Sequence, residues 1–172
     1  MKREFALAPT GKLPWLFLAG LLGILPMLLI AVSVPAAAPG SPQVTYAALA
    51  LTGFTALGIF ALARRRSVAI EGDRLVIRAA LYTQRIPLAE LCPEQARIVD
   101  LREHHQWRPA LRSNGLGLPG LKLGHFRSRG LGKLFCVLTD ASRVLVLPER
   151  GGRALLLSLE RPQALLDALR AR

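Results

Sequence analysis

The densest group of residues with binding chemistry is a basic cluster in the glycine-rich second half of the chain. It consists of Lys122, His125, Arg127, Arg129 and Lys133. Ammonium and guanidinium groups donate charge-assisted hydrogen bonds to phosphate oxygens, and backbone amides of nearby glycines add to such a grip. The cluster therefore predicts a binding site for a phosphate group or an anionic lipid headgroup. The alternative is a solvated basic loop near an anionic membrane surface.

The glycines before this cluster match the string of a dinucleotide-binding motif but not its context. Gly115 to Gly120 reads G-L-G-L-P-G, and Asp140 follows at the distance at which such sites place an acidic residue. A dinucleotide site needs a helix after the glycines, and Pro119 and Gly124 disfavour one. We expect a loop with tight turns instead. An enzyme with a dispersed site in the loop 113–124 stays open as a further hypothesis.

The histidines do not form a recognisable metal site. His104 and His105 are adjacent, so their side chains point in different directions on a strand and do not hold one ion together. Cys92 and His125 add no known ligand spacing. We therefore predict no metal site. Trp107, beside these histidines, is interpreted as a core residue, with an exposed anchor for a partner as the alternative.

The sequence also lacks a recognisable catalytic constellation. Ser142 has no strand–turn–helix context of a nucleophile elbow, and Asp140 is typical of a turn. Cys92 and Cys136 have no obvious activating neighbour, and Cys136 lies in an apolar run that predicts a small core residue. We therefore predict that the chain is not an enzyme and binds no cofactor.

Two uncharged apolar runs determine where these residues are held. They cover about residues 13–34 and 44–63, and each is long enough to cross a hydrocarbon core about 30 Å thick as a helix. The sequence therefore predicts a transmembrane hairpin within an N-terminal part, residues 1–66, in which Pro26 kinks the first helix. The rival interpretation makes the first run a signal peptide, although it is long for one.

Positive charge at the ends of the runs predicts their orientation. Lys2, Arg3 and Lys12 precede the first run and Arg64 to Arg66 follow the second, whereas the short connection between the runs is uncharged. Since positively charged flanks stay cytoplasmic, both termini are expected inside and the connection outside. The prediction is a multi-pass protein of a cytoplasmic membrane.

The strongly basic composition fits partners of negative charge. There are 23 Lys and Arg against 11 Asp and Glu, a net charge of +12. The chain has no basic stripe interleaved with aromatic residues and no helix-turn-helix or zinc-finger spacing, so nucleic acid is not expected as a partner. A domain held beside anionic lipid is the simpler setting for this charge.

Residues 67–172 are predicted to form a β-rich domain. Strands are expected at 67–70, 74–79, 82–88, 96–103 and 153–159, with a hairpin of 133–140 and 143–149 that turns at Ala141 and Ser142. Residues 104–132 are expected to be irregular apart from a strand within 121–126. No periodicity distinguishes a closed barrel from a two-sheet sandwich.

The chain ends in a short amphipathic helix. Pro162 suits its first turn, and Leu165, Leu166 and Leu169 share one face. A helix this short is not stable alone, so we expect it to dock on the sheet and close one open end.

Three segments carry a resemblance to a known family. RSNGLGLPGLKLGHF, LFCVLTDASRVLVLPE and LLLSLERPQALLDAL resemble bacterial membrane proteins with a pleckstrin-homology-like (PH-like) domain, in which two spans commonly precede the domain. The resemblance covers about residues 67–170. It implies a PH-like antiparallel barrel or sandwich with a C-terminal helix, in a bacterial inner membrane protein. Phosphoinositide-binding PH domains place basic residues around the first strand–strand loop, whereas Glu71-Gly72-Asp73 is acidic.

Together these observations predict a non-enzymatic interaction module that two membrane helices hold at the cytoplasmic face. The expected partner is another protein or a second copy of the chain, in addition to the lipid bilayer. The alternative function is binding of an anionic lipid headgroup or a phosphate ligand through the basic cluster.

Overall fold

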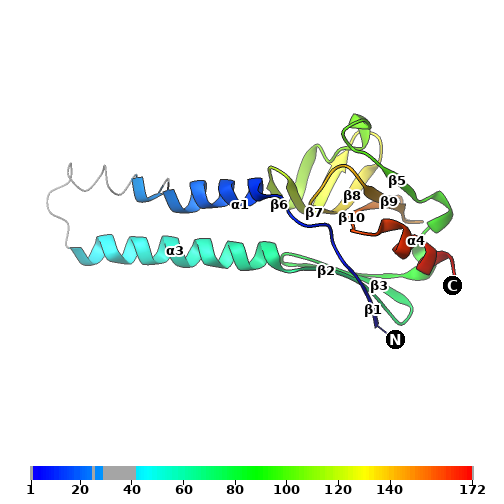
Figure 1. The fold of residues 1–172 in the computed structure, drawn as a ribbon, viewed down its shortest axis with the longest axis horizontal. Coiled ribbons are helices and arrows are strands. Elements are labelled where there is room, and N and C mark those ends of the chain that lie inside the picture. The colour runs from blue at the N-terminus through cyan, green and yellow to red at the C-terminus, as the bar shows by residue number, and fades with distance from the viewer. Residues whose placement is uncertain (1, 25, 29–41, 172) are drawn as a thin grey trace.

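The molecule consists of a β-rich domain from which two helical segments project side by side (Figure 1). The structure, a computed structural model, describes residues 2–24, 26–28 and 42–171. The first segment comprises helix α1 (Lys12–Ala19) and the π-helical turn η1 (Gly20–Ile24). The second is the long helix α3 (Pro42–Arg64).

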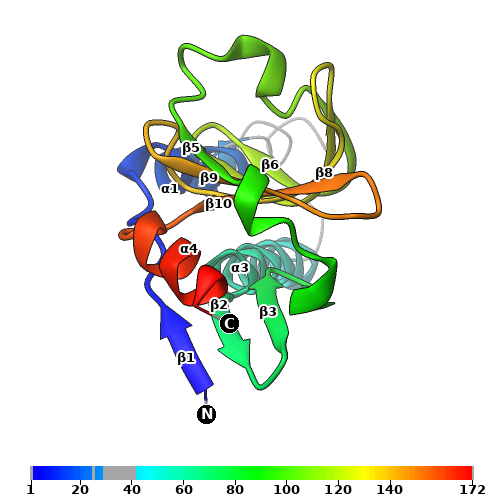
Figure 2. The same cartoon turned by 90° about the vertical axis from the view of Figure 1, so that its right-hand side faces the viewer.

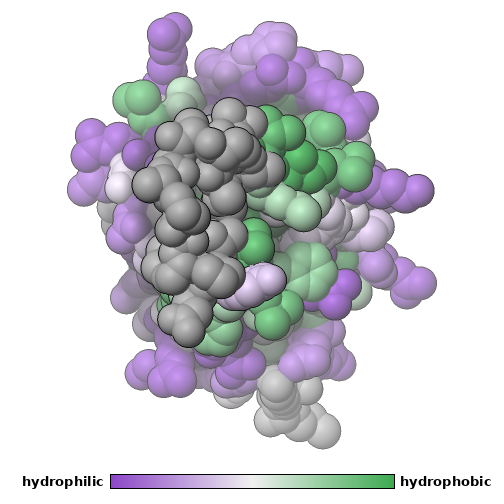
Figure 3. Space-filling model, turned by 90° about the vertical axis from the view of Figure 1, so that its left-hand side faces the viewer, coloured by the Kyte–Doolittle hydropathy of each residue, from purple (hydrophilic) through white to green (hydrophobic). Residues whose placement is uncertain are grey.

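Helix α3 contains the one segment among the described residues that is long and apolar enough to cross a membrane. This segment is Tyr46–Arg64, and only 6% of it is buried within the protein. Leu51, Phe54 and Leu57 are exposed by between 65% and 77%. Figure 3, which views the molecule from the side on which the helices project, shows hydrophobic groups around the helices and hydrophilic groups around the rim.

The first predicted span, residues 13–34, is described only in part. Residues 25 and 29–41, which include the end of this run and most of the predicted connection, lie outside the described residues. The apolar stretch Lys12–Leu28, which passes through residue 25, is shorter than a full span. The described part of the chain thus contains one clear candidate span rather than the predicted pair.

A π-helical turn, η1, precedes Pro26, where the sequence predicts a kink. A proline has no N–H, and its ring crowds the carbonyl four residues earlier, which here belongs to Leu22 in the middle of η1. Since π turns are an identifiable cause of helix bending, we attribute η1 to this proline.

A four-stranded antiparallel sheet follows α3 directly. Its strands are β2 (Arg66–Glu71), β3 (Arg74–Ala79) and β4 (Tyr82–Pro87), with β1 (Lys2–Phe5) paired to β2. The strands predicted at 67–70, 74–79 and 82–88 are confirmed. Strand β1 was not predicted, and it brings residues that precede the first apolar run into the sheet that follows the second.

The N-terminal segment then crosses from this sheet to the second one. The N–H of Ala8 donates to the carbonyl of Ser158, and the N–H of Glu160 donates to the carbonyl of Ala6, both at 3.0 Å. Thr139 Oγ1 donates to the carbonyl of Ala8 at 2.8 Å. The residues before α1 therefore link both sheets.

Six strands form the second sheet, part of which is labelled in Figure 2. They are β5 (Arg97–Val99), β6 (Leu111–Leu118), β7 (Leu121–Ser128), β8 (Gly132–Leu138), β9 (Val144–Pro148) and β10 (Arg153–Ser158). Their spatial order is β5-β9-β10-β8-β7-β6, and β10 runs parallel to β8. The strand predicted at 96–103 is shorter than expected. Single 3-10 turns, η2 (Leu88–Glu90), η3 (Pro93–Gln95) and η4 (His105–Trp107), lie on either side of β5 in the chain.

The predicted hairpin of residues 133–140 and 143–149 is wrong in its pairing. Strands β8 and β9 exist, but β10 lies between them, with Leu156 opposite Cys136 on one side and Val146 on the other. Leu155, Leu156 and Leu157 are all fully buried, as expected for a central strand covered on both faces. The turn at Ala141 and Ser142 is real, but it does not join neighbouring strands.

The region predicted as irregular contains a regular hairpin of β6 and β7, and the strand expected at 121–126 is confirmed within it. Gly115 lies opposite Gly124, with φ values of +155° and +111°. A Cβ on Gly115 would lie 2.3 Å from the carbonyl oxygen of Leu123, and one on Gly124 would lie 2.8 Å from that of Asn114. The glycines therefore permit a close approach of two strands instead of forming a loop.

The main hydrophobic core lies between the two sheets, and helix α4 (Pro162–Arg170) closes one end of it. Leu165, Leu166 and Leu169 of α4 are buried in this core, as predicted. Two separate sheets that enclose a core make a β-sandwich, which resolves the choice between barrel and sandwich that the sequence left open.

A second hydrophobic cluster covers the outer face of the six-stranded sheet. Phe126, Leu134, Cys136 and Leu156 belong to it, and the segment of residues 100–109 contributes the buried Leu101 and the half-buried Trp107. Cys136 is fully buried, and burial raises the pKa of its thiol, which confirms it as a core residue.

Candidate functional site

The five residues of the predicted basic cluster are divided by the alternation of side chains along β7 and β8. Leu123 lies in the core between the sheets and Phe126 in the outer cluster. By alternation, Lys122 points to the outer face, whereas Arg127 points to the inner face. Five residues of strand also separate these two cations by about 16 Å.

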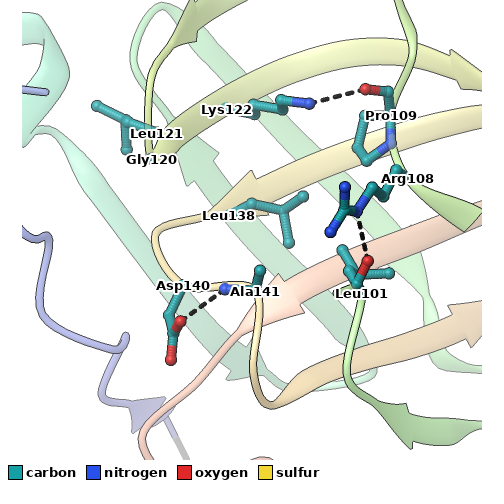
Figure 4. Close-up of a pocket in the computed structure, with 9 residues that line it drawn as sticks. All are labelled: Leu101, Arg108, Pro109, Gly120, Leu121, Lys122, Leu138, Asp140 and Ala141. Atoms are coloured by element: carbon teal, nitrogen blue, oxygen red, sulfur yellow. Dashed lines mark hydrogen bonds between the residues drawn. The ribbon is translucent and has the colours of Figure 1, made fainter. Parts of the chain in front are cut away.

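Lys122 lines a pocket on the outer face of the six-stranded sheet (Figure 4). The pocket has a volume of about 240 Å³. Its other lining residues are Leu101, Arg108, Pro109, Gly120, Leu121, Leu138, Asp140 and Ala141. It is the space that remains where the segment of residues 100–109 lies over the ends of β7 and β8.

The two cations of this pocket hold the overlying segment in place. Lys122 Nζ donates to the carbonyl of Pro109 at 2.7 Å, and Arg108 Nε donates to the carbonyl of Leu101 at 2.5 Å (Figure 4). Burial lowers the pKa of Lys122. The geometry thus gives Lys122 a structural role, and its role in ligand binding stays a prediction.

Asp140, at the rim of the same pocket, is a turn residue, as predicted. Its Oδ1 accepts hydrogen bonds from the N–H groups of Ala141 at 2.7 Å and Ser142 at 3.2 Å, and the hydroxyl of Ser142 donates to Oδ2. The hydroxyl bond is the main reason why the pKa of Asp140 lies below its ordinary value. Ser142 therefore stabilises a turn.

His125 lies on the inner side, near the edge where the two sheets separate. Its ring packs edge-on against Tyr82 and Phe135, with ring centroids 5.6 Å and 5.0 Å apart, and Nε2 lies 3.4 Å from Nε2 of Gln84. Burial, and then the charge of Arg153, lower the pKa of His125. A neutral imidazole in an aromatic setting is a poor ligand for an anion.

Arg127 and Lys133 form a row of like charges with Arg153. Arg127 is directly opposite Lys133, and Lys133 is directly opposite Arg153, so the three side chains leave the same face of adjacent strands. Among the described residues, neither Arg127 nor Lys133 has an ion-pair partner, whereas Arg153 binds Glu149 Oε2 at 2.9 Å.

Arg129 lies in the exposed turn between β7 and β8, beside this row. Arg127, Arg129, Lys133 and Arg153 together are termed the distal pole, because they lie at the ends of strands that lead away from the helices. The sequence predicted three of these residues. It missed Arg153, because only the insertion of β10 beside β8 brings this arginine next to Lys133.

A second basic region lies where α3 enters the domain. The guanidinium carbon of Arg64 lies 4.6 Å from the ring centroid of Phe60 and 6.0 Å from that of Trp15. The two rings are 4.7 Å apart. Arg64, Arg66 and Trp15 together are termed the helix foot. A cation held over aromatic rings in this way makes cation–π contacts.

The remaining motifs do not converge on a reactive centre. The G-x-G-x-x-G string lies in β6 and its turn, and a strand follows it where a dinucleotide site needs a helix. Within the described residues, no three His, Cys, Asp or Glu side chains are grouped to hold a metal ion. His104 stacks on Trp107, with ring centroids 5.2 Å apart.

The β-rich domain matches a known family over all but its N-terminal strand. Residues 66–172, which include every strand except β1, match the family described as Bacterial PH domain. No curated protein and no solved structure matches the chain. Because the match covers more than half of the chain, and because the sandwich with its closing helix agrees with it, the chain belongs to the bacterial PH domain family.

Proposed function

We propose that this chain is a non-enzymatic membrane protein whose PH-like domain docks an acidic protein partner through the distal pole. The observation that carries the proposal is the row of Arg127, Lys133 and Arg153 on three adjacent strands. Like charges directly opposite each other destabilise a sheet. A row that costs folding free energy, and in which two cations have no described ion-pair partner, fits a surface that receives negative charge from outside.

The distance of the pole from the helices favours a protein over lipid as its partner. Six residues of chain separate Lys133 from Thr139, whose hydroxyl contacts Ala8 shortly before α1. At about 3.3 Å per residue, the separation is up to about 20 Å. Because charges are screened beyond about 8–10 Å at physiological salt, lipid binding through the predicted cluster is the weaker alternative. The net charge of +12 disfavours a second copy of the chain.

The proposed anchor of this module is a two-helix hairpin. Since β1 pairs with β2, the chain before the first apolar run and the domain after α3 belong to one folded unit. If α3 crosses a bilayer, the chain between β1 and α3 also crosses it, because both ends of this stretch lie on the same side. The crossing that returns the chain is the first apolar run, residues 13–34, whose described part lies beside α3.

The flanking charges favour the cytoplasmic side of a bacterial inner membrane for both termini. Lys12 and Arg64 to Arg66 lie at the domain end of the two helices. Positively charged flanks stay cytoplasmic. In this orientation the distal pole faces the cytoplasm, where soluble acidic proteins reach it.

Charge reversal at the pole tests the docking proposal. The experiment purifies the full chain in mild detergent and measures how much of an acidic partner protein co-purifies with it. The double variant Arg127→Glu and Lys133→Glu should retain at least about tenfold less of this partner than the wild type does. The matched control, Arg85→Glu with Arg97→Glu, makes the same charge change at two exposed residues of other strands and should recover it fully. Equal recovery by both double variants, or a wild type that carries only copies of itself, rejects docking through the pole.

Cysteine labelling in intact cells tests the anchor and its orientation. Single cysteines at positions 40 and 151, in a background without Cys92 and Cys136, would be exposed to a membrane-impermeant maleimide. Labelling at 40 and not at 151 is the expected result. Labelling at 151 would place the domain outside the cytoplasm and would refute the orientation.

A further inference from the structure

A cleft opens at the helix foot, between the N-terminal segment and the beginning of β2. It has a volume of about 470 Å³, within the range of ligand-binding clefts. Residues 4–7 form one wall, and Arg64 and residues 66–68 form the other. Because α3 ends at Arg64, the cleft lies level with the end of the apolar segment Tyr46–Arg64.

Arg66, which lines this cleft, carries an unsatisfied donor. Its Nη1 is buried and has no hydrogen-bond partner. The side chain is half-buried, and burial lowers the pKa of Arg66. A guanidinium keeps its charge even so, and a buried donor without an acceptor costs free energy. Within the described residues the cleft therefore holds a cation whose hydrogen bonds are incomplete.

Arg64 supplies the second cation, and two aromatic rings contact its guanidinium. The guanidinium lies over the rings of Phe60 and Trp15, and a cation–π contact of this kind leaves N–H groups available as donors. Glu4 is the acidic residue in the same lining. Two arginines against one carboxylate give the cleft a net charge of about +1, which suits a ligand with one negative charge.

We propose that this cleft seats the phosphate of an anionic phospholipid, with Arg64 and Arg66 as the donors. The fork of a guanidinium matches two oxygens of a phosphate, and the apolar segment of α3 beside the cleft gives the acyl chains a surface to follow. A zwitterionic lipid brings its own cation to a site of net positive charge and binds less well. This inference rests on the proposed membrane anchor but not on the partner of the distal pole.

The experiment compares two neighbouring arginines in the full chain. Arg66→Gln removes a cleft donor, whereas Arg65→Gln makes the same charge change at an exposed residue outside the lining. Native mass spectrometry of detergent-released protein with added phosphatidylglycerol should show one bound lipid for the wild type and for Arg65→Gln. Arg66→Gln should bind at least about fivefold less. Phosphatidylcholine should bind the wild type weakly.

Defined outcomes would overturn the proposal. Equal losses in the Arg65 and Arg66 variants would mean that only the total charge matters, and equal binding of both lipids would remove the anionic preference. Displacement of the lipid by millimolar inorganic phosphate would reassign the cleft to a free anion. If Arg66→Gln does not fold, the exposed Arg64→Gln decides by the same readout. Failure of pole docking leaves these results unchanged, since lipid binding is measured in micelles without a protein partner.

Discussion

The distal pole and the helix foot carry the same kind of charge but hold it in different ways. At the pole, hydrogen-bond register places Arg127 and Lys133 opposite each other at the exposed end of the inner sheet face. At the foot, Arg64 rests on two aromatic rings and Arg66 is half-buried. Exposed charges are screened by salt, whereas partly buried ones are screened much less. Binding at the pole is therefore expected to be sensitive to salt, and binding at the foot less so.

This difference shows that the count of arginines does not identify the partner of a basic surface. What distinguishes the two regions is their position relative to the helices and the degree to which their donors are already desolvated.

The largest loss of stability is expected from a substitution in the glycine pair that lets β6 approach β7. Strand β7 carries Arg127 of the distal pole. Gly115→Ala should lower the free energy of unfolding by about 3 kcal/mol or more, because its Cβ would meet the carbonyl oxygen of Leu123 at 2.3 Å. Gly117→Ala is the control, since its Cβ would have ordinary contacts of 3.7 Å and longer. Thermal unfolding in detergent measures both, and equal midpoints would contradict the close approach.

The second largest effect is expected from a substitution that should weaken lipid binding at the helix foot without changing docking at the distal pole. Thr139→Val removes the hydroxyl that donates to the carbonyl of Ala8 and so loosens the N-terminal wall of the cleft. We expect a loss of about 1–2 kcal/mol in stability and weaker phosphatidylglycerol binding, with unchanged docking at the pole. Thr139→Ser keeps the hydroxyl and should restore both properties. A loss of docking in the Val variant would show that the two regions are not independent.

The third effect is an expected gain in stability rather than a loss. Lys133→Glu places a carboxylate between Arg127 and Arg153, so repulsion across the strands becomes attraction. The variant should be more stable than the wild type by about 0.5–1 kcal/mol, and it should therefore unfold at a higher temperature. It should also lose partner docking. Lys133→Gln should give a smaller gain. A Glu variant less stable than the wild type would mean that the row is not under repulsion.

The smallest effect concerns the pH dependence of His125. Its pKa in the folded protein lies below the ordinary value of 6.5, so the unfolded chain takes up a proton first as the pH falls. Stability should therefore decrease as the pH falls through 6.5 towards the folded pKa. His125→Gln should remove this part of the pH dependence, a difference of at most about 2 °C in the unfolding midpoint. A wild type that gains stability over this window would contradict the assignment.

Much of the fold followed from local patterns. The strands predicted at 67–70, 74–79 and 82–88 have clear alternation and short polar turns, and β2, β3 and β4 form at these positions. The leucines of α4 have helical spacing and lie in the core. The prediction that β8 and β9 form a hairpin was wrong. The turn at Ala141 gives a correct local signal, but a local signal cannot exclude a third strand between the two.

The candidate site was only partly predictable. Arg127, Arg129 and Lys133 are near in sequence and come together on one hairpin, whereas Arg153 enters from a strand far along the chain. The loop expected around Gly115 and Gly124 became a strand pair, because glycines that face each other favour close backbone contact as well as turns.

The sequence by itself determined the elements whose signals are local: the apolar run of α3, the arginines that follow it, most strands and the final helix. Local periodicity and composition act within a few residues, so they can be read without the fold. Only the tertiary structure decided that β1 joins β2, that β10 separates β8 from β9, and that Lys122 lies apart from Lys133. Sheet order and the choice of face depend on pairing between distant segments, which is settled by the burial of the whole domain.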